Sequence, residues 1–514
     1  MRTKQMVRIG FTCIVVLLVV SPDIADGEPA ERAKQGNKNQ ADYLQIVRSY
    51  ADTMLEKGRD TYGKEHSPLF ATTLDRKKLR MFDEAGLERL WQIRLQDWEN
   101  WRVRNRDRMT TGSNPMHDQN LYQVLYALTE ITGDKHYDEE ADKTIKWFFE
   151  HCQSPVTGLM AWGEHMGWDF RTEYLIKWKK GSHQGGEMQE YNTHEFYRPW
   201  VLWERSFELA PEACTKFARG VWEHQIGDHN TGNFSRHANY EMHQTFTNSE
   251  YPRHGGYYIA TWAYAYGQTK EPVFAKAIET LVGYFDGRRS PQSDAFPAES
   301  AERSAGKALW TTSNLMYAIC TWNGADYMPE ELAWKMRQSA LRTDRAFFKL
   351  AHDLKPGGKG FIINAHVDTL ELNPGGNSEG WGHAGTAKIC YFRYQQVKLG
   401  EYRQLVLDAA RLYLQKEPEI KHALHPGTLG HVIYLMLNAY ELTGDKGYLE
   451  RADYYAQRSL ELFFNDNSAL PKATTKHDHY EAITGSDTLM MALLELWATK
   501  NRPGLKLRLV YCDR

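Results

Sequence analysis

The chain alternates apolar segments with amphipathic ones, and this alternation repeats along most of its length. The segments from Leu121, LYQVLYALTEITGDKHYDEEADKTIKWFFE, and from Val432, VIYLMLNAYELTGDKGYLERADYYAQRSLELFF, share an apolar helix, a TGD turn and an amphipathic helix. Weaker or looser copies begin at four further positions: Tyr257, Ala387, Phe196 and Leu309. A helix that is apolar nearly all round, followed by one with a charged face, indicates the inner and outer helices of a hairpin.

Seven inner helices are expected, starting near residues 119, 196, 256, 308, 384, 429 and 484. The last, ITGSDTLMMALLELWATK, has no helix after it, so we expect the N-terminal helix YLQIVRSYADTMLEKG to pack outside it and close a ring. Repeats stacked in a line would need polar caps at both ends, and the sequence shows none. We therefore predict an all-α fold, an (α/α)7 or (α/α)6 toroid built as a barrel of helical hairpins.

A closed ring of hairpins places every connection from an outer helix to the next inner helix on the same face. In this sequence those connections are the long ones, whereas turns such as TGDK on the opposite face are short. Long polar loops on a rigid scaffold usually carry binding and catalysis. We therefore expect the functional site on the long-loop face.

Residues 1–27 have the pattern of a secretory signal peptide, with basic MRTKQMVR, twelve apolar residues ending at Val20 and a polar exit. Twelve residues are fewer than the roughly 20 that span a bilayer. We expect a periplasmic or secreted protein without a membrane span, with residues 28–514 as a single catalytic domain. The net charge of −3 argues against general nucleic-acid binding.

Several common active-site patterns are missing. Five cysteines remain after the signal peptide, and their scattered positions exclude a dense disulfide framework and a CxxC metal site. No HExxH and no GxSxG occurs. We therefore expect no metal site and no cofactor.

One stretch, NFSRHANYEMHQTFTNSEYPRHGGYY from Asn233 to Tyr258, concentrates side chains that carry protons or positive charge. Seven of the 20 histidines fall between His183 and His254, whereas an even spread would place about three there. Such a loop suits abstraction of a proton next to a carboxylate. That reaction needs Asn, His or Arg on the carboxylate and Tyr or His for proton transfer.

We therefore predict β-elimination on a uronic-acid polysaccharide, with the polymer as an anionic partner. Asn192 and His194 would neutralise the substrate carboxylate, Arg253 would lower the pKa of Tyr258, and His243 would be a second proton carrier. If Tyr258 lies too far from the other groups, Tyr257 or Tyr251 is the next candidate.

The motif NTHEFY from Asn192, followed about 60 residues later by Arg253 and Tyr258, resembles the Asn-His and Arg-Tyr arrangement of α/α-toroid alginate lyases. The seven-fold hairpin count is similar to that of polysaccharide lyase family thirty-eight. This resemblance implies an (α/α)7 barrel that acts on alginate or glucuronan.

Further residues of the predicted long loops and the mouths of the inner helices are expected to bind substrate, the tryptophans by stacking on sugar rings. They are His117, Trp162, Glu164, His165, Lys179, Arg236, His237, Tyr240, Tyr251, His254, Trp381 and His383.

Three other functions fit the same toroid. A glycoside hydrolase, including the unsaturated glucuronyl type, would use paired carboxylates such as Asp118 and Glu164. A sugar epimerase would use a pair of histidines but would rarely need export. A glycan-binding protein would need the aromatic residues and lysines but not the histidines and tyrosines.

Overall fold

The computed structural model describes residues 42–179, 188–190, 192–299 and 307–512. The signal peptide predicted for residues 1–27 lies outside the described residues. The unit that follows, Asp42–Arg514, is compact. Its helices are α1 (Tyr43–Lys57), α2 (Glu84–Gln96), α3 (Trp98–Trp101), α4 (Pro115–Thr132), α5 (His136–His151), α6 (Trp203–Leu209), α7 (Pro211–Gly220), α8 (Pro252–Thr269), α9 (Pro272–Gly287), α10 (Thr311–Gly324), α11 (Glu330–Phe348), α12 (His383–Val397), α13 (Gly400–Gln415), α14 (Pro426–Thr443), α15 (Lys446–Phe463) and α16 (Ser486–Asn501).

Short strands lie in the connections between helices. They are β1 (Thr73–Leu74), β2 (Gly112–Ser113), β3 (Trp168–Asp169), β4 (Tyr174–Leu175), β5 (Lys177–Lys179), β6 (Met188–Glu190), β7 (Thr193–His194), β8 (Ile226–Asp228), β9 (Asn233–Phe234), β10 (Ala238–Asn239), β11 (Ala308–Trp310), β12 (Asn364–His366) and β13 (Tyr480–Glu481). All the pairs among them are antiparallel.

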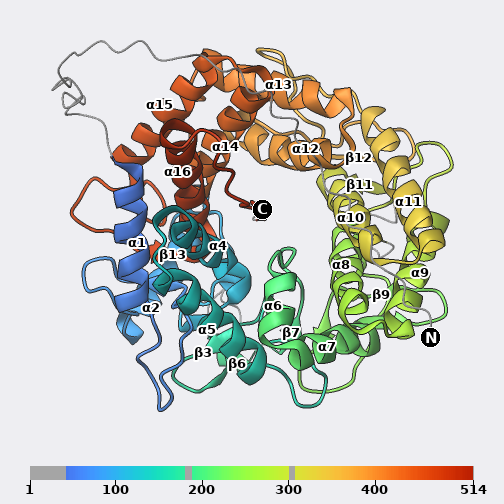
Figure 1. Cartoon of the computed structure of the whole chain (residues 1–514), viewed down its shortest axis with the longest axis horizontal. Helices are drawn as coiled ribbons and strands as arrows, with labels where there is room; N and C mark the ends of the chain where they lie inside the picture. The colour runs from blue at the N-terminus through green and yellow to red at the C-terminus, as the bar shows by residue number, and fades with distance from the viewer. Residues whose placement is uncertain (1–41, 180–187, 191, 300–306, 513–514) are drawn as a thin grey trace, which may run out of the picture. The chain divides into compact units, whose positions relative to one another are not determined.

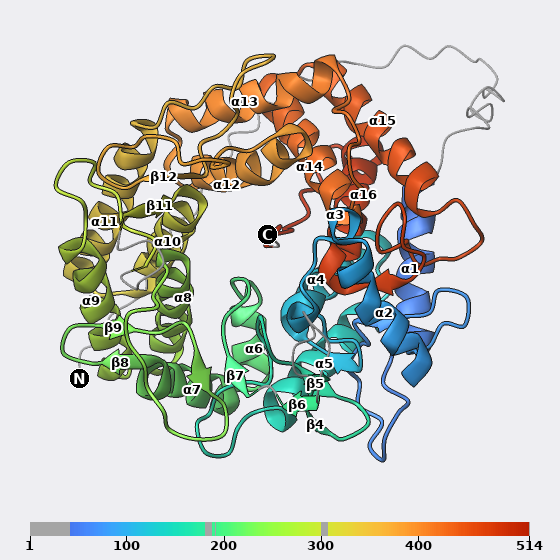
Figure 2. The ribbon, with the colours of Figure 1, turned by 180° about the vertical axis from the view of Figure 1, so that it is seen from behind.

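Apart from α2 and α3, the helices of this unit form two concentric rings (Figure 1). The inner ring consists of α4, α6, α8, α10, α12, α14 and α16, and the outer ring consists of α5, α7, α9, α11, α13, α15 and α1. From α8 to α16 each inner helix packs on the next, and α16 packs on α4, while α6 meets the first hairpin through α5. Figure 2 shows the same ring from behind. The fold is the predicted α/α toroid, with seven helical pairs.

The N-terminal helix completes the ring as expected, because α1 packs against α16. One expected boundary is wrong: the second inner helix begins at Trp203 and not near residue 196. The residues before it instead include β7 and an irregular stretch that enters the candidate site.

The short turns of the hairpins follow from their sequence. In both TGD turns the glycine has a left-handed conformation, with φ of 78° at Gly133 and 72° at Gly444, and ends the inner helix. Asp445 then caps α15 by accepting a hydrogen bond from the backbone N–H of Gly447. A glycine stop and an acidic cap need only two or three residues, so these turns are short. The long connections lie on the opposite face.

None of the described helices combines the length and the apolar character that crossing a membrane requires. The five described cysteines are buried, and no disulfide joins any two of them.

The segment after α16, which we call the C-terminal tail (Leu505–Cys512), runs into the middle of the ring (Figure 1). It packs on inner helices and does not continue the outer ring. The pair Tyr511 and Tyr434 stacks with ring centroids 3.9 Å apart.

Close packing of neighbouring inner helices depends on glycine. A Cβ atom at Gly430 of α14 would lie 2.9 Å from the backbone N of Leu489 and the backbone C of Thr488, both in α16. Backbone atoms cannot move aside as a flexible side chain can, so this contact requires glycine.

We predict that Gly430→Ala lowers the free energy of unfolding by about 1–3 kcal/mol, the usual cost of overpacking. Urea unfolding followed by circular dichroism measures the change. Gly283→Ala in α9 is the matched control, because its Cβ would meet nothing within 4 Å. A helical Gly→Ala change at such an open position adds about 0.5–1 kcal/mol of stability. Equal effects of the two substitutions would contradict this account of the packing.

A buried ion pair joins two of the long connections. The guanidinium of Arg108 donates from Nε and Nη2 to the two carboxylate oxygens of Glu481, both at 2.7 Å, and both residues are at most 1% exposed. Burial alone would raise the pKa of Glu481, but Arg108 and His479 outweigh it and lower that pKa to about 2. The pair therefore fixes the loop before α4 to the loop before α16.

This lowered pKa predicts how stability depends on pH. Ionised Glu481 contributes stability above its ordinary pKa of 4.5, and that contribution is lost as the pH falls from about 4.5 to about 2. In Glu481→Gln the unfolding free energy should be lower by about 3–5 kcal/mol near neutral pH, because Arg108 loses its charged partner. The Glu481→Gln protein should also lose less unfolding free energy than wild type between pH 4.5 and pH 2. Urea midpoints at several pH values test both points, with the exposed Glu56→Gln as the control, and parallel pH profiles of wild type and Glu481→Gln would refute the assignment.

Candidate active site

The candidate site forms where three long-loop segments meet. Strand β7 pairs with β10 so that His194 is opposite Ala238, which places Glu195 beside His237. A parallel bridge between Gly163 and Glu195 brings in a third segment, and with it His165. Gly163 has φ of 131°, and a Cβ there would lie 2.1 Å from the carbonyl oxygen of Glu195, so only glycine allows this approach.

Glu195 is the centre of the site and is fully buried. Its Oε2 lies 2.8 Å from His237 Nε2 and 3.3 Å from His165 Nε2. Its Oε1 lies 3.1 Å from Arg236 Nε and 3.2 Å from His254 Nε2. Burial alone would raise the pKa of this carboxyl, but the hydrogen bonds from the surrounding imidazoles hold it well below the usual range. The site thus places one carboxylate among four nitrogen-bearing side chains.

The imidazole of His165 is held from both sides. Its Nδ1 lies 3.3 Å from Asp107 Oδ1, opposite the contact with Glu195. Burial opposes protonation of this ring, but Asp107 and Glu195 raise its pKa to about 9. A carboxylate behind the second nitrogen is the arrangement that orients a metal-binding histidine.

His165, Glu195 and His237 could hold a metal ion. One ligand atom from each lies within 4.8 Å of the other two. Two imidazole nitrogens and one carboxylate oxygen suit Mn²⁺, Fe²⁺, Co²⁺, Ni²⁺ or Zn²⁺. From the sequence we expected no metal site, because these three residues match no local metal motif.

Next to this group, two arginines and two aromatic rings form a stack. The Arg236 guanidinium carbon lies 4.5 Å from the centre of the Tyr251 ring, and that of Arg253 lies 5.0 Å from it. The rings of Tyr251 and Trp310 are stacked with centroids 4.7 Å apart. Arg236 also reaches Glu299 at 3.4 Å. We call His165, Glu195 and His237 the Glu195 group. The stack connects this group to the middle of the ring.

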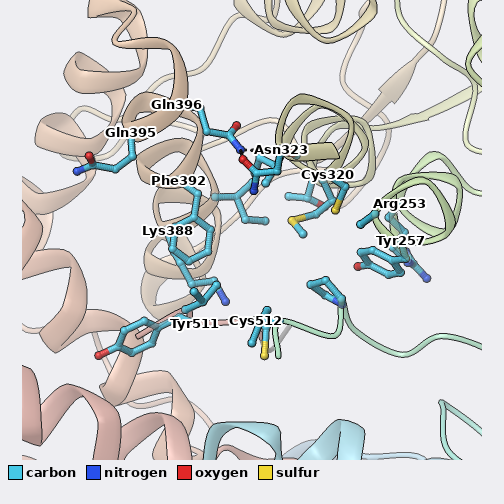
Figure 3. A pocket seen from close by; sticks show the side chains of 18 of the residues that line it. Arg253, Tyr257, Cys320, Asn323, Lys388, Phe392, Gln395, Gln396, Tyr511 and Cys512 are labelled. Carbon is cyan, nitrogen blue, oxygen red and sulfur yellow. Dashed lines mark hydrogen bonds between the residues drawn. The ribbon is translucent and has the colours of Figure 1, made fainter. Parts of the chain in front are cut away.

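A cavity of about 670 Å³ fills part of the ring's lumen, within the usual range for ligand sites. Figure 3 shows Arg253 and Tyr257 of α8 on one side, Asn323 of α10 and Lys388 of α12 on another, and the C-terminal tail across from them. Arg253 therefore belongs both to the stack and to the wall of the cavity.

Two of the predicted catalytic residues lie in the core. His194 is fully buried, accepts a hydrogen bond from the Trp162 indole at 3.2 Å, and has its pKa lowered to about 4 by burial. Tyr258 is also fully buried, with its ring against Phe234 and Trp262 at 5.2 and 6.1 Å. Burial raises the pKa of Tyr258 well above its usual value. Neither side chain can contact a polysaccharide in this structure, which corrects the roles predicted for them.

The other predicted catalytic residues are placed differently from one another. Arg253 lines the cavity. Asn192 donates from Nδ2 to the Glu241 carboxylate at 2.9 Å, and exposed His243 pairs with His224 at 2.8 Å between their Nδ1 atoms. No described contact joins Asn192 or His243 to Glu195.

Among the predicted substrate-binding residues, His165, Arg236, His237, Tyr251 and His254 come together at the site. His254 is fully buried, and burial lowers its pKa to about 3, so this ring is a neutral support for Glu195.

Four other predicted binding residues are held by contacts with neighbouring residues of the protein. Trp162 and Tyr240 are in the core, and Tyr240 directs its hydroxyl at the carbonyl of Cys152. Buried His117 packs edge-on against Tyr197 at 5.2 Å. Glu164 pairs with Arg104.

Three more predicted binding residues lie elsewhere. Trp381 donates from its indole to the Glu419 carbonyl at 3.2 Å. His383 bonds to Ser378 at 2.7 Å. Lys179 belongs to β5, but its side chain lies outside the described part of the chain.

Residues 92–264, roughly a third of the chain, match the family model described as periplasmic pectate lyase. This segment contains the Glu195 group, Arg236, Tyr251 and Arg253. The resemblance to polysaccharide lyase family thirty-eight stays a prediction.

Solved structures of similar fold include three carbohydrate-active proteins. A cellobiose 2-epimerase from Bacillus thermoamylovorans is 9% identical, with 88% of this chain and 99% of that chain covered and a TM-score of 0.46. An α-1,6-mannanase variant of Salegentibacter is 8% identical, with 89% and 99% covered and a TM-score of 0.44. An unsaturated glucuronyl hydrolase specific for heparin is 9% identical, with 89% and 97% covered and a TM-score of 0.45.

We predict that Mn²⁺, Co²⁺, Ni²⁺ or Zn²⁺ raises the melting temperature of EDTA-treated protein. An ion at 100 times its Kd adds about 2.7 kcal/mol to the stability of the folded state. His165→Ala and His237→Ala should abolish the shift, and differential scanning fluorimetry measures it. His243→Ala removes an exposed histidine of the same loop and should leave the response unchanged. If His237→Ala responds as wild type does, the ion binds elsewhere.

Proposed function

We propose that the chain is an exported polysaccharide lyase that cleaves a uronic-acid polymer by β-elimination. Polygalacturonate is the first substrate to test, and alginate and glucuronan are the alternatives that the sequence suggests. The observation that supports the proposal is the group His165, Glu195 and His237 beside Arg236, within the segment similar to the periplasmic pectate lyase family model.

β-Elimination transfers the C5 proton of a uronate to a base, here solvent water, breaks the C4–O4 bond as O4 takes a proton from a general acid, and leaves a C4–C5 double bond. Negative charge builds up on the C6 carboxylate as the proton leaves, so positive charge placed at that carboxylate lowers the barrier. A divalent ion held by His165, Glu195 and His237 would supply Lewis-acid stabilisation of this charge. Arg236 provides a positive charge beside the same group, and its side chain is 17% exposed to solvent.

Tyr251 takes the place of Tyr258 as the proposed proton donor to the departing O4. The guanidinium carbons of Arg236 and Arg253 lie 4.5 and 5.0 Å from the centre of its ring. Burial raises the pKa of Tyr251, although both arginines oppose the rise, so its hydroxyl is protonated at neutral pH. A protonated phenol close to the cleaved bond is suited to act as a general acid.

The surroundings of the site suit an anionic sugar chain. Arg253 and Lys388 line the lumen, and Trp310 adds an aromatic surface next to Arg253. Sugar rings stack on aromatic faces, and arginine pairs with carboxylates in a two-point geometry. Export to the periplasm would bring the enzyme to such a polymer.

The hydrolase alternative depends on a pair of accessible carboxylates. Asp118 is only 1% exposed and accepts a hydrogen bond from Ser113. Burial, together with the charge of Asp487, raises the pKa of Asp118 well above its usual value. Glu164 is paired with Arg104. These surroundings favour structural roles, so the lyase is the better supported function.

We predict that the protein generates ultraviolet absorbance from polygalacturonate, alginate or glucuronan, because the product contains a new C4–C5 double bond. Arg236→Lys should lower kcat/KM at least about 100-fold. Lysine keeps the positive charge but cannot reproduce the planar two-point contact that a guanidinium makes with the substrate carboxylate. Absorbance assays on the three polymers measure both effects.

Arg171→Lys is the matched control, because Arg171 is an exposed arginine in a loop on the same face. Tyr258→Phe should also keep most of the activity, whereas Tyr251→Phe should lose most of it. If reducing ends appear without absorbance, the protein is a hydrolase and the lyase proposal fails.

A further inference from the structure

The C-terminal tail lies in the lumen and forms one wall of its cavity. The cavity is lined by α8, α10 and α12, by Tyr434 of α14, by residues of the Pro199–Val201 segment and by the tail residues Leu509–Cys512. Neither α4 nor α16 contributes to its lining. The tail therefore lies between the cavity and these two helices, to which it is hydrogen-bonded.

Specific hydrogen bonds hold the tail in this position. The backbone of Val510 pairs twice with the Gln123 side chain: its N–H donates at 2.7 Å and its carbonyl accepts at 3.0 Å. The Cys512 thiol donates to Asn120 Oδ1 at 3.1 Å. Both partners are in α4, and both are buried. A segment bound this closely is a fixed wall of the cavity.

The tail also covers an acidic group. The hydroxyl of fully buried Tyr511 donates to Glu495 Oε2 of α16 at 2.7 Å, and its ring stacks on Tyr434. Burial raises the pKa of Glu495 to about 8. Because Tyr511 also lines the cavity, its side chain separates the Glu495 carboxyl from the space that a polyanion would occupy.

The position of Val510 shows what the tail presents to a ligand. Its side chain is 39% exposed, although its backbone is fixed to α4, and the residue lines the cavity. Arg253 and Lys388 line other walls of the same cavity. A sugar chain in the lumen would thus have an apolar wall of the tail on one side and cationic groups on others.

We infer that the C-terminal tail is a specificity element for an oligouronate bound in the lumen. Residues Leu509–Cys512 form the wall against which the sugar chain lies, and they separate its carboxylates from Glu495. This inference deepens the proposed function and rests on it, since the ligand is taken to be a uronic-acid oligosaccharide.

A substitution that fills the cavity tests the wall. Calorimetry with hexagalacturonate and hexaguluronate in EDTA measures binding while metal-dependent turnover is stopped. Val510→Trp should raise Kd at least about tenfold, a loss of about 1.4 kcal/mol. Val156→Trp is the matched control, because Val156 is 64% exposed and does not line the cavity, and it should bind as wild type does.

A truncation tests the screening of Glu495. Removal of residues 509–514 should weaken binding, and Glu495→Gln in the truncated chain should recover at least half of the loss on a logarithmic scale. The same substitution in the full chain should leave Kd within about twofold, because the tail already separates Glu495 from the ligand. Helical circular dichroism confirms that each variant is folded.

The outcomes separate the two proposals. If wild type cleaves a polyuronate but Val510→Trp binds as tightly as wild type, or the truncated chain binds as tightly as the full one, the tail inference is overturned and the lyase stands. If wild type neither binds nor cleaves any of the polymers, the proposed function fails and the tail inference fails with it.

Discussion

The buried carboxylate of Glu195 is the constraint on which the candidate site depends. Removing an ionised carboxylate from water costs several kcal/mol, and in this structure only close partners offset that cost. His165, Arg236, His237 and His254 come from three separate segments, and each meets Glu195 at 3.3 Å or less. The long loops are therefore held together at one point by electrostatics. A metal ion would strengthen the same point, because it would share Glu195 with two of these histidines.

The ring carries this point on a rigid support. Helix α8 begins at Pro252, and its first two turns carry His254, which reaches Glu195, together with Arg253 and Tyr257, which line the lumen. Helix α8 thus fixes the position of Glu195 and its partners relative to the cavity. The lumen of a seven-pair ring is wide, and the protein fills part of it with its own tail. Ring closure and tail together decide how much space is left for a ligand.

The sequence predicted the fold better than the site, and the reason is physical. Helical hairpins produce a period of 3.6 over many residues, so apolar first helices and TGD turns indicate the toroid directly. The site instead depends on contacts between residues far apart, such as His165, Glu195 and His237, whose spacing matches no local metal motif. The density of His and Arg between Asn233 and Tyr258 indicated the stretch that contains Arg236, His237 and His254 of the candidate site. It could not show which of these side chains are buried.

His194 and Glu195 illustrate that limit, since they are neighbours with opposite surroundings. Side chains alternate across an extended backbone, so if one of two neighbours points into the core, the next points away from it. Here His194 enters the aromatic core beside Trp162, and Glu195 meets the site. A slip of one residue between β7 and β10 would exchange the two and leave a carboxylate in the core. A backbone hydrogen bond supports this register: the N–H of Glu164 donates to the Glu195 carbonyl at 3.0 Å, an approach that is possible only because residue 163 is glycine. The chemistry of the site is therefore set as much by a glycine and a two-residue strand as by the charged residues themselves.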